Sequence, residues 1–173
     1  DYRALLSELP LNPGEMDRLR PWLAELTLSS SFYGEQAFSV SDGADARLLG
    51  YALAHKKALR YLESPRQQLE LLANSVGTSE VNSFETFVTS LHDSPRGINS
   101  TTAAWLSGDV DRLSMDLQAT LAAENPAAKA VLLDDRNRAW AAEIGRMLED
   151  GKTYFVTVGV GHLGGPGSVI DLL

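Results

Sequence analysis

Apolar residues recur every three or four positions along most of the chain, which is the spacing of helices with one buried face. The pattern predicts a helix in the segment that Asn12-Pro13 begins, with a restart at Pro21. Further helices are expected over about 45–57, over 81–91, around Trp105, over 113–121, and from Asn125-Pro126 to Asp150-Gly151.

Two short motifs punctuate this pattern. In Ser64-Pro65-Arg66-Gln67, Ser is a good N-cap, Pro suits the first helical position and Gln suits the third, so a helix is expected to start here. Ser94-Pro95-Arg96-Gly97 is expected to interrupt the chain as a loop.

Only two segments have the composition of β-strands. Ala58–Leu62 is short and partly apolar, and Thr153–Val158 is β-branched and aromatic throughout. Helical crossovers between neighbouring strands favour parallel pairing. The expected fold class is therefore α/β: a helix-rich chain with part of a small parallel sheet, incomplete at both ends, whose remaining strands are missing or come from another chain.

Charge and composition exclude several classes of function. The formal net charge is −8 and no cluster of Lys and Arg is present, so a nucleic-acid or anionic-membrane surface is not expected. The absence of Cys excludes disulfides and thiolate metal sites. No apolar run approaches the length of a membrane span, and residues 1–10 show no targeting signal.

A glycine-rich loop follows the second β-type segment and contains the formal pattern Gly159-Val160-Gly161-His162-Leu163-Gly164. A dinucleotide fingerprint requires a second strand with an acidic residue about 20 positions later. Only nine residues follow Gly164, and Pro166 interrupts the loop. We therefore expect the glycines to let the backbone turn sharply and present His162, either as a functional group or as a satisfied structural histidine.

Glu63 occupies the equivalent place after the first β-type segment. If both strands lie in one sheet, Glu63 and His162 emerge at the same edge, where a carboxylate and an imidazole suit metal ligation or acid–base chemistry. The alternative for Glu63 is an acid favoured by the positive end of the helix that follows it. His55 and His92 lie in polar surroundings and are expected to be solvated.

Arg136 and Asn137 interrupt an apolar stripe formed by Leu133, Trp140, Ile144 and Met147. An arginine on an inward face must be paired, because an unpaired buried charge is very costly. Arg136 is thus either part of a half-buried salt bridge or snorkelling to the surface, or it is a cation aimed at an anionic intermediate or at a carboxylate.

Motifs spread over nearly the whole chain carry a family likeness: LRPWLAEL (19–26), GADARLL (43–49), RYLESPRQQLELL (60–72), AAWLSGD (103–109), DRNRAWAAEI (135–144) and YFVTVGVGHLGGPGSV (154–169). The chain resembles the TraB/GumN family, which is related to the TIKI proteases and more distantly to erythromycin-esterase-like and ChaN-like proteins. By this resemblance, Gly159-Val160-Gly161-His162 is the second of two G-x-x-H motifs. Glu63 matches the acidic residue of an L-E-T/S motif, and Arg136-Asn137 matches an R-N pair.

The resemblance implies metal-dependent chemistry. His162 and Glu63 are expected to be metal ligands, with catalytic roles for Glu63, Arg136 and Asn137 and with manganese, cobalt or zinc as the metal. The first G-x-x-H is expected to precede Asp1, so residues 1–173 are interpreted as a single domain that lacks this segment. A metal site needs about three protein ligands, so this chain alone is expected to be inactive.

The expected function is a metal-dependent hydrolase, in particular a peptidase, acting on a peptide or another small molecule. The alternative is a non-catalytic protein of the same fold that binds a ligand or peptide. A homo-oligomer or association with the missing segment would complete the site. Members of the family are often exported, so the cell envelope is the expected location.

Overall fold

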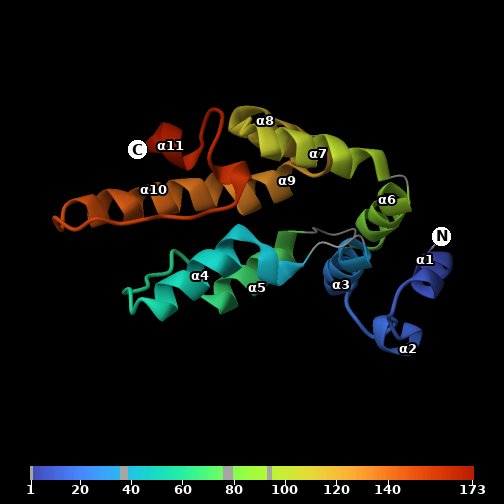
Figure 1. The fold of residues 1–173 in the computed structure, drawn as a ribbon. Coiled ribbons are helices and arrows are strands. Elements are labelled where there is room, and N and C mark those ends of the chain that lie inside the picture. The colour runs from blue at the N-terminus through green and yellow to red at the C-terminus, as the bar shows by residue number, and fades with distance from the viewer. Residues whose placement is uncertain (1, 36–38, 76–79, 93–94) are drawn as a thin grey trace. The chain divides into compact units, whose positions relative to one another are not determined.

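The computed structural model describes residues 2–35, 39–75, 80–92 and 95–173. Over these ranges the chain forms helices and connecting segments, and it contains no β-strand (Figure 1). The predicted α/β fold class with a parallel sheet is therefore wrong, and the described chain is all-helical.

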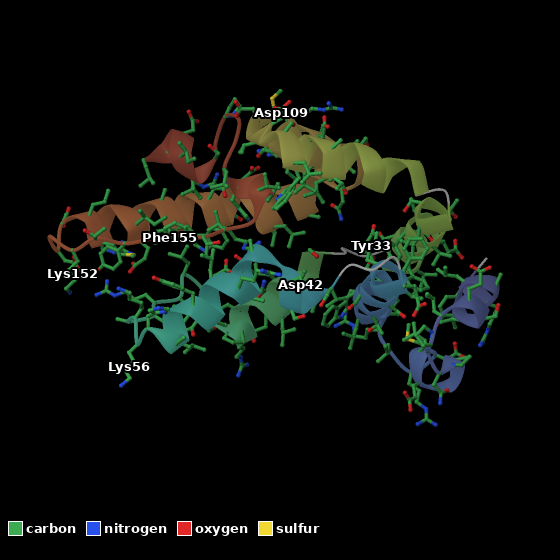
Figure 2. The ribbon with its side chains drawn as sticks, in the orientation of Figure 1. Tyr33, Asp42, Lys56, Asp109, Lys152 and Phe155 are labelled. Carbon is green, nitrogen blue, oxygen red and sulfur yellow. The ribbon has the colours of Figure 1, made fainter. Side chains whose placement is uncertain are left out.

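The two segments predicted as strands are irregular connections. Their β-type composition reflects only local propensity, whereas a strand is stable when a partner supplies ladder hydrogen bonds and its side chains are covered. In the second segment Phe155 is 81% exposed and Val156 is 39% exposed, so these two side chains lack that cover (Figure 2). The end of the segment is covered, where Val158 packs against the cluster of Trp140, Ile144 and Val169. In the first, Tyr61 is 75% exposed.

The chain folds into two compact units, here called unit 1 (1–61 and 78–94) and unit 2 (62–77 and 95–173). Unit 1 contains α1 (Tyr2–Glu8), α2 (Pro13–Met16), α3 (Pro21–Glu35), η1 (Val40–Asp42), α4 (Ala44–Ala54) and α6 (Glu80–His92). Unit 2 contains α5 (Pro65–Ser75), α7 (Pro95–Ser107), α8 (Val110–Glu124), α9 (Pro126–Lys129), η2 (Ala130–Asp134), α10 (Asp135–Leu148), η3 (Val160–His162) and α11 (Val169–Leu172).

The core of unit 1 is apolar. It consists of Leu5, Leu6, Met16, Ala24, Leu28, Val88 and Leu91. Helix α6 packs against α3 and α1, and the ring of Tyr2 meets Phe84 edge-on at a centroid distance of 5.3 Å. The helix predicted over 81–91 is observed as α6, in which Val88 and Leu91 are buried and Val81 is 61% exposed. Helical spacing therefore predicted the buried face of α6 correctly except in its first turn, where Val81 is exposed.

Two predicted helix starts in unit 2 are confirmed. The backbone N–H of Gln67 donates to Ser64 Oγ at 3.2 Å, and the N–H of Ser64 donates to Gln67 Oε1 at 2.8 Å, so α5 begins with a capping box. Asn125 Oδ1 accepts from the N–H of Ala128 at 3.0 Å and caps α9. The loop predicted at residues 94–97 is wrong where the structure describes it, because α7 already begins at Pro95.

The helices of unit 2 meet around the glycine-rich loop. Helices α7 and α8 run side by side, α8 packs against η3, and α10 packs against α11 (Figure 1). Helices α9 and α10 are joined without a break by the π-helical turn η2. No helix in the described residues is long and apolar enough to cross a membrane.

Candidate functional site

Glu63 and Arg136 form a paired, largely buried salt bridge in unit 2. Arg136 Nε donates to Glu63 Oε1 at 2.7 Å, and Arg136 Nη2 donates to Glu63 Oε2 at 3.0 Å. The side chains of Arg136 and Glu63 are only 17% and 15% exposed, respectively. A fork-to-fork pair of this kind fixes the guanidinium plane as well as its position. The pairing that the apolar stripe predicted for Arg136 is therefore observed.

The π-helical turn η2 contributes to the placement of Arg136. Arg136 Nη1 donates to the carbonyl oxygen of Leu132 at 2.9 Å, one turn earlier in the same helix. The wider turn changes the backbone pairing, as the N–H of Asp135 donates to the oxygen of Ala130 five residues before it. The guanidinium also stacks over the Trp140 ring at 4.5 Å.

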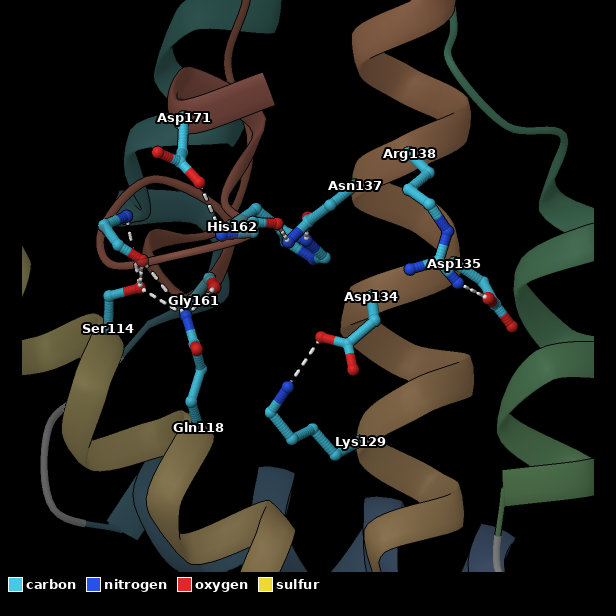
Figure 3. Close-up of polar contacts among 12 residues, drawn as sticks. Ser114, Gln118, Lys129, Asp134, Asp135, Asn137, Arg138, Gly161, His162 and Asp171 are labelled. Atoms are coloured by element: carbon cyan, nitrogen blue, oxygen red, sulfur yellow. Dashed lines mark hydrogen bonds and ion pairs between the residues drawn. The ribbon is translucent and has the colours of Figure 1, made fainter. Parts of the chain in front are cut away.

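Asn137 fixes the tautomer of His162. Asn137 Nδ2 donates to the carbonyl oxygen of Gly167 at 2.8 Å, so its Oδ1 must be the acceptor in the 2.6 Å contact with His162 Nδ1 (Figure 3). His162 therefore carries its proton on Nδ1, and Nε2 keeps its lone pair. Asn137 and His162 are 1% and 6% exposed.

His162 is held in its neutral form. Burial, and secondarily the nearby Arg136 guanidinium, lower its pKa from the ordinary 6.5 to about 4, while the Glu63 carboxylate acts in the opposite direction. Arg136 Nη1 lies 3.4 Å from His162 Nε2. A neutral imidazole with an oriented ring is a suitable metal ligand. Because its pKa is low, the same imidazole is a weak general base at neutral pH.

The predicted site residues thus come together, by a route different from the one expected. No sheet edge exists to gather them in the described residues; instead Glu63 stands just before α5, Arg136 and Asn137 lie in the first turn of α10, and His162 ends η3. Arg136 contacts both Glu63 and His162, and Asn137 contacts His162.

A metal ion fits His162 better than it fits the cluster as a whole. Both carboxylate oxygens of Glu63 are held by Arg136, and a cation on His162 Nε2 would face the guanidinium at short range. In the part of the chain that the structure describes, no three His, Cys, Asp or Glu side chains gather as a metal ion requires. His162 can therefore serve as one metal ligand, whereas Glu63 can do so only if its salt bridge with Arg136 opens.

The other two histidines, His55 and His92, belong to unit 1. His55 is exposed, stacks on Tyr51 at a centroid distance of 4.0 Å, and has Nδ1 2.8 Å from the Tyr51 carbonyl oxygen. Its predicted solvation is confirmed. His92 is the last residue of α6, and its side chain, for which solvation was also predicted, lies outside the described residues.

Sequence reasoning missed Ser114 and Gln118, which hydrogen-bond the glycine-rich loop from α8. A serine and a glutamine four positions apart lie on one face of a helix, and that was the available signal. Spacing alone gave no reason to place this face against a loop about 50 residues later.

The model of the TraB/PrgY/gumN family matches residues 1–173. No curated protein and no solved structure matches the chain significantly.

Proposed function

Because the chain belongs to the TraB/PrgY/gumN family, we propose that the cluster of Glu63, Arg136, Asn137 and His162 belongs to the active site of a metal-dependent hydrolase. Peptide bonds are the first class of substrate to test. The observation that carries the proposal is the state of His162, whose neutral ring keeps a lone pair on Nε2 while Asn137 holds Nδ1–H.

Each residue has a distinct task in this proposal. His162 would hold a manganese, cobalt or zinc ion, and Asn137 keeps the ring in the tautomer that leaves Nε2 without a proton. Arg136 stabilises negative charge that develops on the substrate oxygen, and Glu63 orients its guanidinium. A bound metal ion supplies Lewis acidity and lowers the pKa of a coordinated water.

The ligand count limits what residues 1–173 do alone. Among the described residues His162 is one ligand, and a catalytic metal needs about three protein ligands, so in this proposal further ligands come from a longer chain or from another copy. We therefore propose that the segment alone binds these metals weakly and that association completes the site. Residence in the cell envelope is part of the same proposal, and fractionation of cells checks it.

The test uses the longest natural protein that contains residues 1–173, assayed on peptide libraries with manganese, cobalt or zinc. We expect His162→Ala to abolish hydrolysis and stoichiometric metal binding in calorimetric titration, with His55→Ala unchanged. Glu63→Gln is expected to lower kcat about 100-fold, because the guanidinium loses its orienting partner. The exposed, similarly paired Glu70 provides a matched control in Glu70→Gln.

A second candidate function has its own supporting observation. The closed salt bridge between Glu63 and Arg136, together with a single imidazole, is also what a non-catalytic ligand-binding protein would contain. Two results together would favour this candidate over the hydrolase. The longest natural protein that contains residues 1–173, here called the parent protein, would bind a peptide without metal and hydrolyse none, and Arg136→Lys would abolish this binding.

A further inference from the structure

A fully buried serine of α8 holds the backbone of the glycine-rich loop. Ser114 is 0% exposed, and its Oγ donates to the carbonyl oxygen of Gly164 at 2.9 Å. The same Oγ accepts from the backbone N–H of Gly164 at 3.2 Å. One hydroxyl therefore satisfies both backbone polar groups of a buried residue 50 positions away, which would be costly to leave unpaired.

Gln118, one turn later on the same face of α8, extends this contact toward the histidine. Its Nε2 donates to the carbonyl oxygen of Gly164 at 3.0 Å and lies 3.4 Å from that of Gly161 (Figure 3). It also lies 3.3 Å from Ser114 Oγ, which joins the two side chains in one network. Gly161 immediately precedes His162, so this network reaches the backbone next to the imidazole.

The close approach of α8 explains Gly164 and also brings a side chain of α8 against Gly161. A Cβ on Gly164 would lie 3.0 Å from Ser114 Cβ and 3.1 Å from Asp111 Cα. A Cβ on Gly161 would lie 2.6 Å from Leu117 Cδ2. These glycines bring a loop backbone against a helix, which is a different use from cradling a phosphate.

His162 is consequently held between two helices. On one side Asn137 of α10 binds the imidazole and the carbonyl oxygen of Gly167. On the other side Ser114 and Gln118 of α8 bind the backbone at 161–164. The 2.6 Å contact from Nδ1 to Asn137 requires the loop to lie within hydrogen-bond distance of α10, and the contacts with α8 hold the same loop from its other side.

We propose that Ser114 and Gln118 are positioning residues that fix His162 in the Nδ1–H tautomer with Nε2 free of its proton. The proposal deepens the hydrolase function, on which it rests for the chemical task of His162. The geometric part of the proposal can nevertheless be measured without any turnover.

The experiment records the ring nitrogens of His162 by long-range proton–nitrogen NMR at pH 7.5, in the wild type and in Ser114→Ala and Gln118→Met. Gln118→Met keeps the side-chain length and removes the donor. Matched controls are Ser107→Ala and Thr120→Ala, whose hydroxyls donate to carbonyl oxygens of their own helices, at Ala104 and Asp116. The exposed ring of His55 serves as the internal reference.

We expect one dominant Nδ1–H tautomer in the wild type and in both controls. The ratio of the two tautomers should fall about fivefold or more in Ser114→Ala and less in Gln118→Met, since loss of one hydrogen bond shifts an equilibrium by about this factor. If Ser114→Ala does not fold, Gln118→Met decides the matter, because Gln118 is only half-buried. An unchanged tautomer in folded Gln118→Met would then overturn the proposal, as would an unchanged tautomer in both variants.

Assays of the parent protein separate this proposal from the function on which it rests. A tautomer shift without peptide hydrolysis or metal binding in the parent would reject the hydrolase and retain the positioning role. Hydrolysis that is normal in both variants, with an unshifted tautomer, would reject the positioning role and retain the hydrolase.

Discussion

Unit 1 and unit 2 bury different kinds of side chain. The core of unit 1 is built of aliphatic residues, with Leu28 fully buried at 0% exposure. The buried polar side chains of the described residues, which are Ser114, Asn137, His162 and Ser168, all belong to unit 2. Buried polar groups are costly unless they are hydrogen-bonded, and these four side chains are. Among the described residues, the buried Nε1 of Trp140 in unit 2 and that of Trp22 in unit 1 have no hydrogen-bond partner. Unit 1 therefore depends mainly on packed volume, and unit 2 also depends on specific partners.

The largest expected effect tests this contrast directly. Leu28→Ala should lower the free energy of unfolding of unit 1 by about 3 kcal/mol, because it removes buried methyl groups and leaves a cavity. Leu28→Met should cost less than about 1.5 kcal/mol, since it conserves volume. Hydrogen exchange of unit 1 amides measures both.

Asn137→Leu is the counterpart in unit 2. It also roughly conserves volume, yet it leaves His162 Nδ1–H and the Gly167 carbonyl oxygen unpaired, at about 1–3 kcal/mol each. A cost for Asn137→Leu as small as that of Leu28→Met would remove the distinction between the two units.

An effect of similar size should appear as a pH dependence of the stability of unit 2. The pKa of His162 is about 4 in the folded protein and near 6.5 when unfolded, so the unfolded state binds more protons between these values. The stabilisation is fully present above pH 6.5 and is lost as the pH falls toward 4, with a total of about 3 kcal/mol. Denaturant titrations across this window measure it, and His162→Gln should flatten this part of the curve. Equal slopes in the wild type and in the variant would contradict the assignment.

The smallest expected effect compares two glycines within unit 2. Gly164→Ala should destabilise by about 1–2 kcal/mol, because its Cβ would press on Ser114 and on the backbone of α8. Gly145→Ala should instead stabilise by about 0.5–1 kcal/mol, since nothing lies within 4 Å of its Cβ position and Ala is the better helix former. Thermal unfolding resolves both changes. A stabilising Gly164→Ala would show that α8 does not need this close approach.

Local signals in the sequence predicted local structure well. The capping box at Ser64 and the Asn125 cap are properties of a few neighbouring residues, and both are observed. Thr153–Val158 has an equally clear local signal and forms no strand, because a strand depends on a partner that composition does not reveal. The predicted sheet depended on contacts between residues distant in the sequence, which local composition does not show.

In the candidate site, too, the residues could be predicted from local signals but their contacts could not. Glu63, Arg136 and His162 could be selected from motifs and from the interrupted apolar stripe, since each signal lies in its own segment. The bidentate geometry between Glu63 and Arg136 and the support from Ser114 arise from contacts 73 and 50 residues apart. Spacing along the chain carries no information about such contacts.

The π-helical turn has a consequence for the phase of the helix that carries Arg136 and Asn137. Ala128 and Leu133 are both buried although they are five residues apart, a separation that a regular α-helix would turn through about 140°. The turn η2 absorbs one surplus residue, so the inward direction is the same before and after it. Residues 130–134 thus shift the direction in which the following side chains point around the helix axis. Arg136 and Asn137 face the site because of this shift as well as because of their own side chains.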